Sequence, residues 1–93
     1  MPNGLLNWNF KDVERFLRKH YFKHVNTEGS HFYYRGCVDG QERLTFVPWH
    51  RGKSIPPKTL ESIIHKSGIP KNFWKKWGNG NKNIHYEGVR ARK

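Results

Sequence analysis

Two histidines stand in positions suited to proton transfer. His31 follows Gly29 and Ser30, and His50 directly precedes Arg51. Histidine acts as a general acid or base near neutral pH because its unperturbed pKa is about 6.5. RNA carries its own nucleophile, the 2′-hydroxyl, so cleavage needs only a base for this proton and an acid for the leaving oxygen. We predict that His31 does this chemistry, the plain alternative being a surface histidine at a strand start. His50 is either the complementary acid or a strand cap.

The surroundings of these histidines suit a phosphate. The Gly29-Ser30 turn presents backbone N–H groups to an anion, and Arg51 and Lys53 can neutralise its charge. With 18 Lys and Arg against 7 Asp and Glu, the net charge is +11, which attracts polyanions. Nucleic acid is the commonest of these, ahead of an acidic protein or an anionic membrane. The cations expected to bind phosphate are Arg15, Arg18, Lys19, Lys23, Arg35, Arg51, Lys53, Lys58 and Lys66.

The remaining aromatic and titratable residues give weaker signals. We expect Trp77 to stack on RNA bases and Trp74 to pack in the core. His20 and His24 are four residues apart, but no third metal ligand stands nearby. We therefore expect no metal and no other cofactor. Ordinary structural or surface roles are expected for His20, His24, His65 and His85.

The single cysteine, Cys37, excludes an internal disulfide and so a disulfide-stapled secreted fold. We expect Cys37 to be buried or half-buried near a turn. The chain has no run of about 18 apolar residues, so no transmembrane helix is expected. The N-terminus lacks the pattern of a signal peptide. We therefore expect a cytoplasmic protein without a membrane partner.

Helices are expected to flank the stretch that carries these residues, both before it and after it in the sequence. Asn9 is a typical N-cap, and apolar residues at helical spacing predict a helix over residues 9–20. The pair Pro56-Pro57 opens a second helix that Gly68 ends, and residues 70–77 fit a short third one. The residues expected in the buried stripes of the two longer helices are Phe10, Val13, Phe16, Leu17, Tyr21, Leu60, Ile63, Ile64 and Ser67.

Three strands are expected between the first two helices. Alternating polar and apolar residues predict strands over residues 21–27, 31–36 and 43–49. Asp39-Gly40 is a strong hairpin signal. Residues 78–93 contain little apolar surface, and we expect them to form a basic, poorly packed and flexible tail behind a domain of residues 1–77.

This order predicts an α+β fold in which a helix, three antiparallel strands and a helix form two layers, followed by a short extra C-terminal helix. Both longer helices would bury their apolar stripes on one face of the sheet. Double-stranded-RNA-binding domains share this order, although a fold does not by itself define a function.

The stretch from residue 29 to 69 also carries a set of motifs. They are Gly29-Ser30-His31, then Val47-Pro48-Trp49-His50-Arg51-Gly52-Lys53, then a helix with Leu60 and Ile63 that ends at Ser67-Gly68. In this order they resemble the HicA toxin family of bacterial toxin–antitoxin systems, over roughly residues 8–74. The family often has a second histidine after the first, where this chain has Phe32. The part after about Lys75 matches nothing in the family pattern.

The resemblance implies a toxin with a fold like that of double-stranded-RNA-binding domains. It implies an endoribonuclease that cuts messenger RNA without a metal, with His31 as the essential residue. It also implies a HicB-type antitoxin that covers the active face. With His31 and the second candidate His50 as the catalytic residues, the residues expected to contact RNA are Gly29, Ser30, Arg35, Arg51, Lys53, Lys58 and Trp77.

Two other functions fit the composition. One is an RNA- or DNA-binding module of the same fold that does no chemistry, and the other is an interaction protein whose basic face docks an acidic partner. A pure binder needs only Lys and Arg, whereas His31 and His50 bracket the predicted sheet. This difference favours the ribonuclease.

Overall fold

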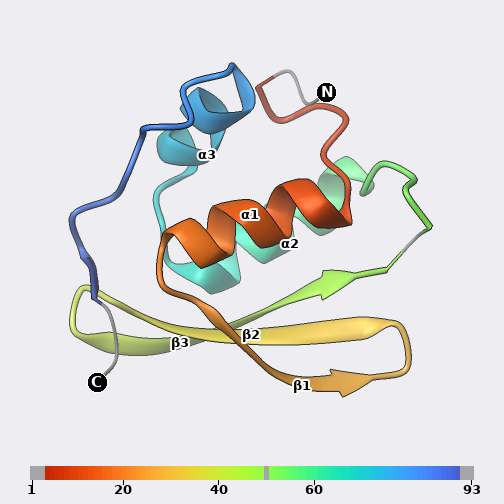
Figure 1. Cartoon of the computed structure of the whole chain (residues 1–93), viewed down its shortest axis with the longest axis horizontal. Helices are drawn as coiled ribbons and strands as arrows, with labels where there is room; N and C mark the ends of the chain where they lie inside the picture. Colours follow the sequence, from red (N-terminus) through yellow and green to blue (C-terminus); the bar gives the residue numbers. More distant parts are fainter. Residues whose placement is uncertain (1–3, 50, 91–93) are drawn as a thin grey trace.

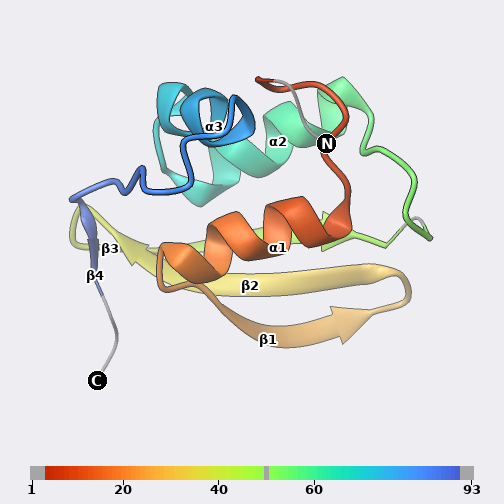
Figure 2. The same cartoon turned by 45° about the horizontal axis from the view of Figure 1, so that its top comes forward.

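The structure, a computed structural model, describes residues 4–49 and 51–90. Its elements are α1 (Phe10–Lys19), β1 (Lys23–Glu28), β2 (His31–Val38), β3 (Gln41–Pro48), α2 (Pro57–Ser67), α3 (Lys71–Gly78) and β4 (Val89–Arg90). The three helices lie on one side of the sheet and leave its other side open (Figures 1 and 2). The predicted α+β fold, with the order of a double-stranded-RNA-binding domain and an extra C-terminal helix, is confirmed.

The sheet is an antiparallel meander in the order β1-β2-β3. Asp39 (φ 53°) and Gly40 (φ 79°) make the tight turn between β2 and β3, as predicted from this pair. Strand side chains alternate between the two faces of a sheet. Tyr34 is buried under the helices and Phe32 packs against Phe10 of α1. It follows that the alternate residues of β2, which are His31, Tyr33 and Arg35, face the open side.

Helix α1 begins as the sequence predicts. The Asn9 side chain accepts a hydrogen bond from the Asp12 N–H, and the Asp12 carboxylate accepts one from the Asn9 N–H. The predicted stripe is buried from Phe10 to Leu17, and the stripe of α2 is buried as predicted. Tyr21 is the exception. It adopts a left-handed backbone (φ 65°) and is 43% exposed, so the first strand begins at Lys23 instead.

Aromatic rings fill the space between α1 and α3. The Phe16 ring stacks on Trp74 with 3.9 Å between centroids, and on His20 with 4.3 Å. Trp77 meets Phe16 edge-on at 5.4 Å. The core position predicted for Trp74 is confirmed. Trp77, predicted to be exposed for stacking on bases, is also buried, because the two tryptophans lie three residues apart on one face of α3.

Residues 79–90, which we call the strap, run from α3 back to the sheet (Figure 1). The Tyr86 N–H donates to Nε2 of His20 at 3.1 Å, and the Tyr86 hydroxyl donates to the Asp39 carboxylate at 2.9 Å. Val89 is 3% exposed and pairs with Val38 of β2. The strap therefore makes specific contacts with α1 and β2 that were not predicted, although most of its residues are exposed. Its few apolar groups are supplemented by backbone hydrogen bonds that composition does not reveal. That the tail moves as a separate unit stays a prediction.

The contact between His20 and the strap predicts a pH dependence of stability. Burial lowers the pKa of His20 to about 4. In the unfolded chain the pKa returns to about 6.5. Between these two values the unfolded chain binds a proton that the folded chain does not, so the free energy of unfolding falls as the pH falls. We expect a loss of roughly 3 kcal/mol between about pH 7 and about pH 4, at 1.36 kcal/mol per pKa unit.

Urea unfolding at a series of pH values measures this loss. The matched variant is His20→Gln, whose amide can donate to the Phe16 carbonyl and accept from the Tyr86 N–H without titrating. Carboxylates contribute equally to both proteins, so the difference between the two curves isolates His20. Parallel curves would show that the proton on His20 has no such effect.

Candidate functional site

His31 is the first residue of β2 and is exposed. In the sheet it lies opposite Glu28 of β1 and Pro48 of β3. Its ring meets the Phe46 ring edge-on, with 5.6 Å between centroids. The imidazole therefore lies on the open side of the sheet, near one end, where a large substrate can reach it.

The turn before His31 leaves its backbone accessible. Gly29 has a left-handed φ of 58°, and a Cβ built there would meet no atom within 4 Å. Ser30 is exposed, and its carbonyl accepts a hydrogen bond of 2.8 Å from the Trp49 N–H. This bond fixes the turn against the end of β3. An anion can therefore approach the turn without displacing a side chain.

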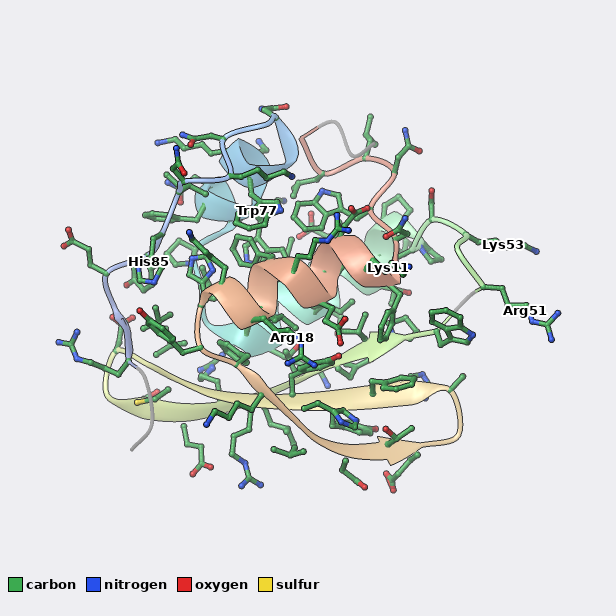
Figure 3. The ribbon with its side chains drawn as sticks, viewed as in Figure 1. Lys11, Arg18, Arg51, Lys53, Trp77 and His85 are labelled. Carbon is green, nitrogen blue, oxygen red and sulfur yellow. The ribbon has the colours of Figure 1, made fainter. Side chains whose placement is uncertain are left out.

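Arg51 and Lys53 lie in the exposed loop between β3 and α2. Figure 3 shows both at the far right of the view and pointing into solvent, with His85 toward the opposite end of the molecule. Neither forms an ion pair with a residue that the structure describes. Their full charge is thus available at the end of the sheet that carries His31. The second predicted histidine, His50, lies outside the described residues.

The other predicted RNA contacts are more scattered. Arg35 is on the open side, but its Nε is 3.0 Å from Oε1 of Glu42, which offsets part of its charge. Lys58 is exposed in the first turn of α2, on the helix side. Trp77 is 6% exposed, and Nζ of Lys82 lies 4.9 Å above its ring. Trp77 is therefore closed to a base in this structure.

Two residues near His31 were not singled out from the sequence. Trp49 is 43% exposed and packs edge-on against Phe10 at 5.2 Å. It leaves the sheet directly after Pro48, so its ring stays at the surface beside the turn. Glu28 lies opposite His31 in the β1–β2 register and is exposed. The signal for Trp49 was the proline that ends β3. The signal for Glu28 was the register of the β1–β2 hairpin.

Phe32, the residue directly after His31, faces the opposite side of the sheet. Because adjacent strand residues face opposite ways, Phe32 points to the helix side, where its ring lies 4.9 Å from that of Phe10. A second histidine at this position would face the helices and not the side that carries His31.

The titratable residues show no cluster of a metal-binding type. Within residues 4–49 and 51–90, no three His, Cys, Asp or Glu side chains gather in a group that could hold an ion. His20 is in the core, and Nε2 of His24 lies 2.6 Å from the Thr27 hydroxyl. Cys37 is half-buried, as predicted. Over the same residues, no helix has the length and apolar character needed to cross a membrane.

Comparison with known protein families gives a match over most of the chain. A family model described as the HicA toxin of bacterial toxin–antitoxin systems matches residues 10–69. The matched range runs from the start of α1 to just beyond α2, so it includes His31 and leaves out α3 and the strap. No curated protein and no solved structure matches the chain significantly.

Proposed function

This chain belongs to the HicA toxin family of bacterial toxin–antitoxin systems, and from that membership we propose that it is an endoribonuclease that cuts messenger RNA in the cytoplasm. A toxin of such a system has a cognate antitoxin as its partner. The observation that carries the proposal is that His31 is exposed beside an open turn, at the end of the sheet that leads into the loop of Arg51 and Lys53, two cations for which the described residues show no ion pair.

The proposed reaction uses the 2′-hydroxyl of RNA. A base removes its proton, the 2′-oxygen bonds to the adjacent phosphorus, and the bond to the 5′-oxygen breaks as that oxygen takes a proton from an acid. The products are a 2′,3′-cyclic phosphate and a free 5′-hydroxyl. His31 performs one of these proton transfers. The group that performs the other stays open. The candidates are Glu28, which lies opposite His31 in the β1–β2 register, and His50, the second histidine predicted from the sequence.

The cations supply the electrostatic part of the mechanism. Negative charge develops on the phosphoryl oxygens in the transition state, and positive groups near them stabilise it. Arg51 and Lys53 carry that role in the proposal, together with the N–H groups of the Gly29-Ser30 turn. This chemistry needs no metal ion.

The proposal is tested by mixing the purified chain with end-labelled RNA in excess EDTA. We expect fragments that end in a 2′,3′-cyclic phosphate and begin with a 5′-hydroxyl. Fragments with a 3′-hydroxyl and a 5′-phosphate would contradict the mechanism. Binding without any cutting would favour the alternative, a module of the same fold that only binds nucleic acid.

Replacing both loop cations tests their part directly. We expect Arg51→Ala with Lys53→Ala to weaken RNA binding and to reduce the slope of log K against log salt by about 1.4, since each phosphate contact to a single strand contributes about 0.7. The measurement is a salt titration of RNA affinity. The matched control is Lys75→Ala with Lys76→Ala, two exposed cations on α3 that change the net charge equally. An equal effect of both pairs would assign binding to overall charge alone.

The antitoxin completes the proposal. We place a HicB-type protein over the side of the sheet that carries His31, where it would block access of RNA. A surface that complements a chain of net charge +11 is acidic, so we expect an acidic face on that antitoxin.

A further inference from the structure

The open side of the sheet carries an aromatic pair that the proposed mechanism does not use. Tyr33 of β2 and Phe46 of β3 lie directly opposite each other. Both are half-buried, so part of each ring faces solvent. Leu44, two residues from Phe46 along β3, is 49% exposed. Apolar side chains on a sheet face that no helix covers call for an occupant.

His31 lies at the edge of this aromatic surface. It stands two residues before Tyr33 on β2, and its ring is 5.6 Å from that of Phe46. Three flat side chains therefore lie next to one another on one face. A substrate on the helix side would be separated from His31 by the sheet, whereas a substrate on the open side lies on the imidazole and the two rings together.

Cations border the same surface. Nζ of Lys66, at the end of α2, lies 5.5 Å from the centroid of the Phe46 ring. Lys23 of β1 lies opposite Arg35 of β2 in the sheet register. Flat rings bordered by positive charge are the combination that binds single-stranded nucleic acid, because bases stack on the rings while cations hold the backbone.

We propose that the open face of the sheet, centred on Tyr33 and Phe46, is the platform that binds single-stranded RNA and brings its backbone to His31. A duplex fits this surface poorly, since its bases are stacked on each other and their faces are not available to a protein ring. The substrate class is therefore unpaired RNA. The inference rests on the proposed function for its account of His31, and its test is independent of cutting.

Binding is measured in the His31→Ala background, so that RNA stays intact. The test variant adds Tyr33→Leu and Phe46→Leu, which keep apolar volume and remove the flat rings. We expect at least about tenfold weaker binding of a fluorescent single-stranded RNA, since stacking on one ring contributes about 1–3 kcal/mol. The matched control is Tyr21→Leu, an exposed aromatic residue outside the platform, which should change affinity less than about twofold. A duplex of the same sequence should bind more weakly than the single strand.

The chain's only cysteine gives a second test without changing the rings. Cys37 has the same parity along β2 as His31 and Tyr33, so it lies on the open side. A photo-crosslinker attached to its thiol should capture single-stranded RNA. The control moves the thiol to the helix side, in a Cys37→Ser, Lys11→Cys chain, where we expect little capture. This test applies even where the double variant fails to fold.

The outcomes separate the two proposals. Loss of affinity in the double variant together with capture at Cys37 supports the platform, including for a wild-type chain that cuts no RNA, in which case only the ribonuclease proposal fails. Unchanged affinity with capture at position 11 overturns the platform and leaves cleavage by His31 intact. Preference for the duplex over the single strand also overturns it.

Discussion

His31→Ala should lower the rate of RNA cleavage by about 10²- to 10⁴-fold, the usual contribution of a positioned acid or base. Its stability should stay within about 0.5 kcal/mol of wild type, because the side chain is exposed at a strand end. RNA affinity should change little, since phosphate binding depends mainly on Lys and Arg. Cleavage, melting and RNA binding of the two proteins give the three readouts.

The control for this variant is His65→Ala, which removes an exposed imidazole from α2. It should cut RNA at the wild-type rate. Wild-type cutting by His31→Ala would show that another residue carries the proton. His50→Ala belongs in the same experiment, because an equal loss would make it the paired acid and a small loss would make it a strand cap.

Phe16→Ala should remove about 3–5 kcal/mol of stability, the usual cost of deleting a buried phenylalanine ring. This ring contacts Trp8, Trp74 and Trp77 as well as His20, so its loss opens a cavity between α1 and α3. Small domains are stable by only about 5–15 kcal/mol. At roughly 4–8 °C of melting temperature per kcal/mol for a domain of this size, the variant should melt at least about 12 °C below wild type. Urea unfolding measures the change.

Phe16→Ala and His31→Ala should lose RNA cleavage for different reasons. Phe16→Ala should lose cleavage together with its folded signal and regain both on mild cooling, whereas His31→Ala should stay folded and inactive at every temperature. Tyr21→Ala is the matched control, because it deletes an exposed aromatic ring. A Phe16→Ala protein that melts like wild type would show that the aromatic core does not depend on this ring.

Local signals in the sequence predicted the elements well. The Asn9–Asp12 capping box and the Asp39-Gly40 turn depend on neighbouring residues, so their sequence determines their structure. The strap was missed because its contacts join residues far apart in the chain, such as Tyr86 and His20. Trp77 was predictable in principle. Its spacing from Trp74 puts both on one helix face, but only Trp74 was predicted to lie in the core, and Trp77 was predicted to stack on bases.

In the candidate site, too, residues that are neighbours in the sequence were predicted, and residues that only strand pairing brings together were not. Gly29, Ser30 and His31 are contiguous, so the motif identifies them directly. Tyr33 and Phe46 come together only through strand register, which depends on the length and geometry of the β2–β3 turn. Single-residue reasoning about side-chain types does not reveal such pairs, and the same holds for Glu28 opposite His31.

The strap follows the sheet and all three helices in the sequence, and this affects how the domain forms during translation. Tyr86 and His20 are 66 residues apart, so their hydrogen bond waits until residue 86 has left the ribosome. The meander that carries His31 needs only closer contacts, which form faster. A nascent or prematurely ended chain thus assembles its RNA-facing sheet before Val89 and Tyr86 secure it. We expect proteases to remove such chains more readily than finished ones, because local opening exposes them to cleavage.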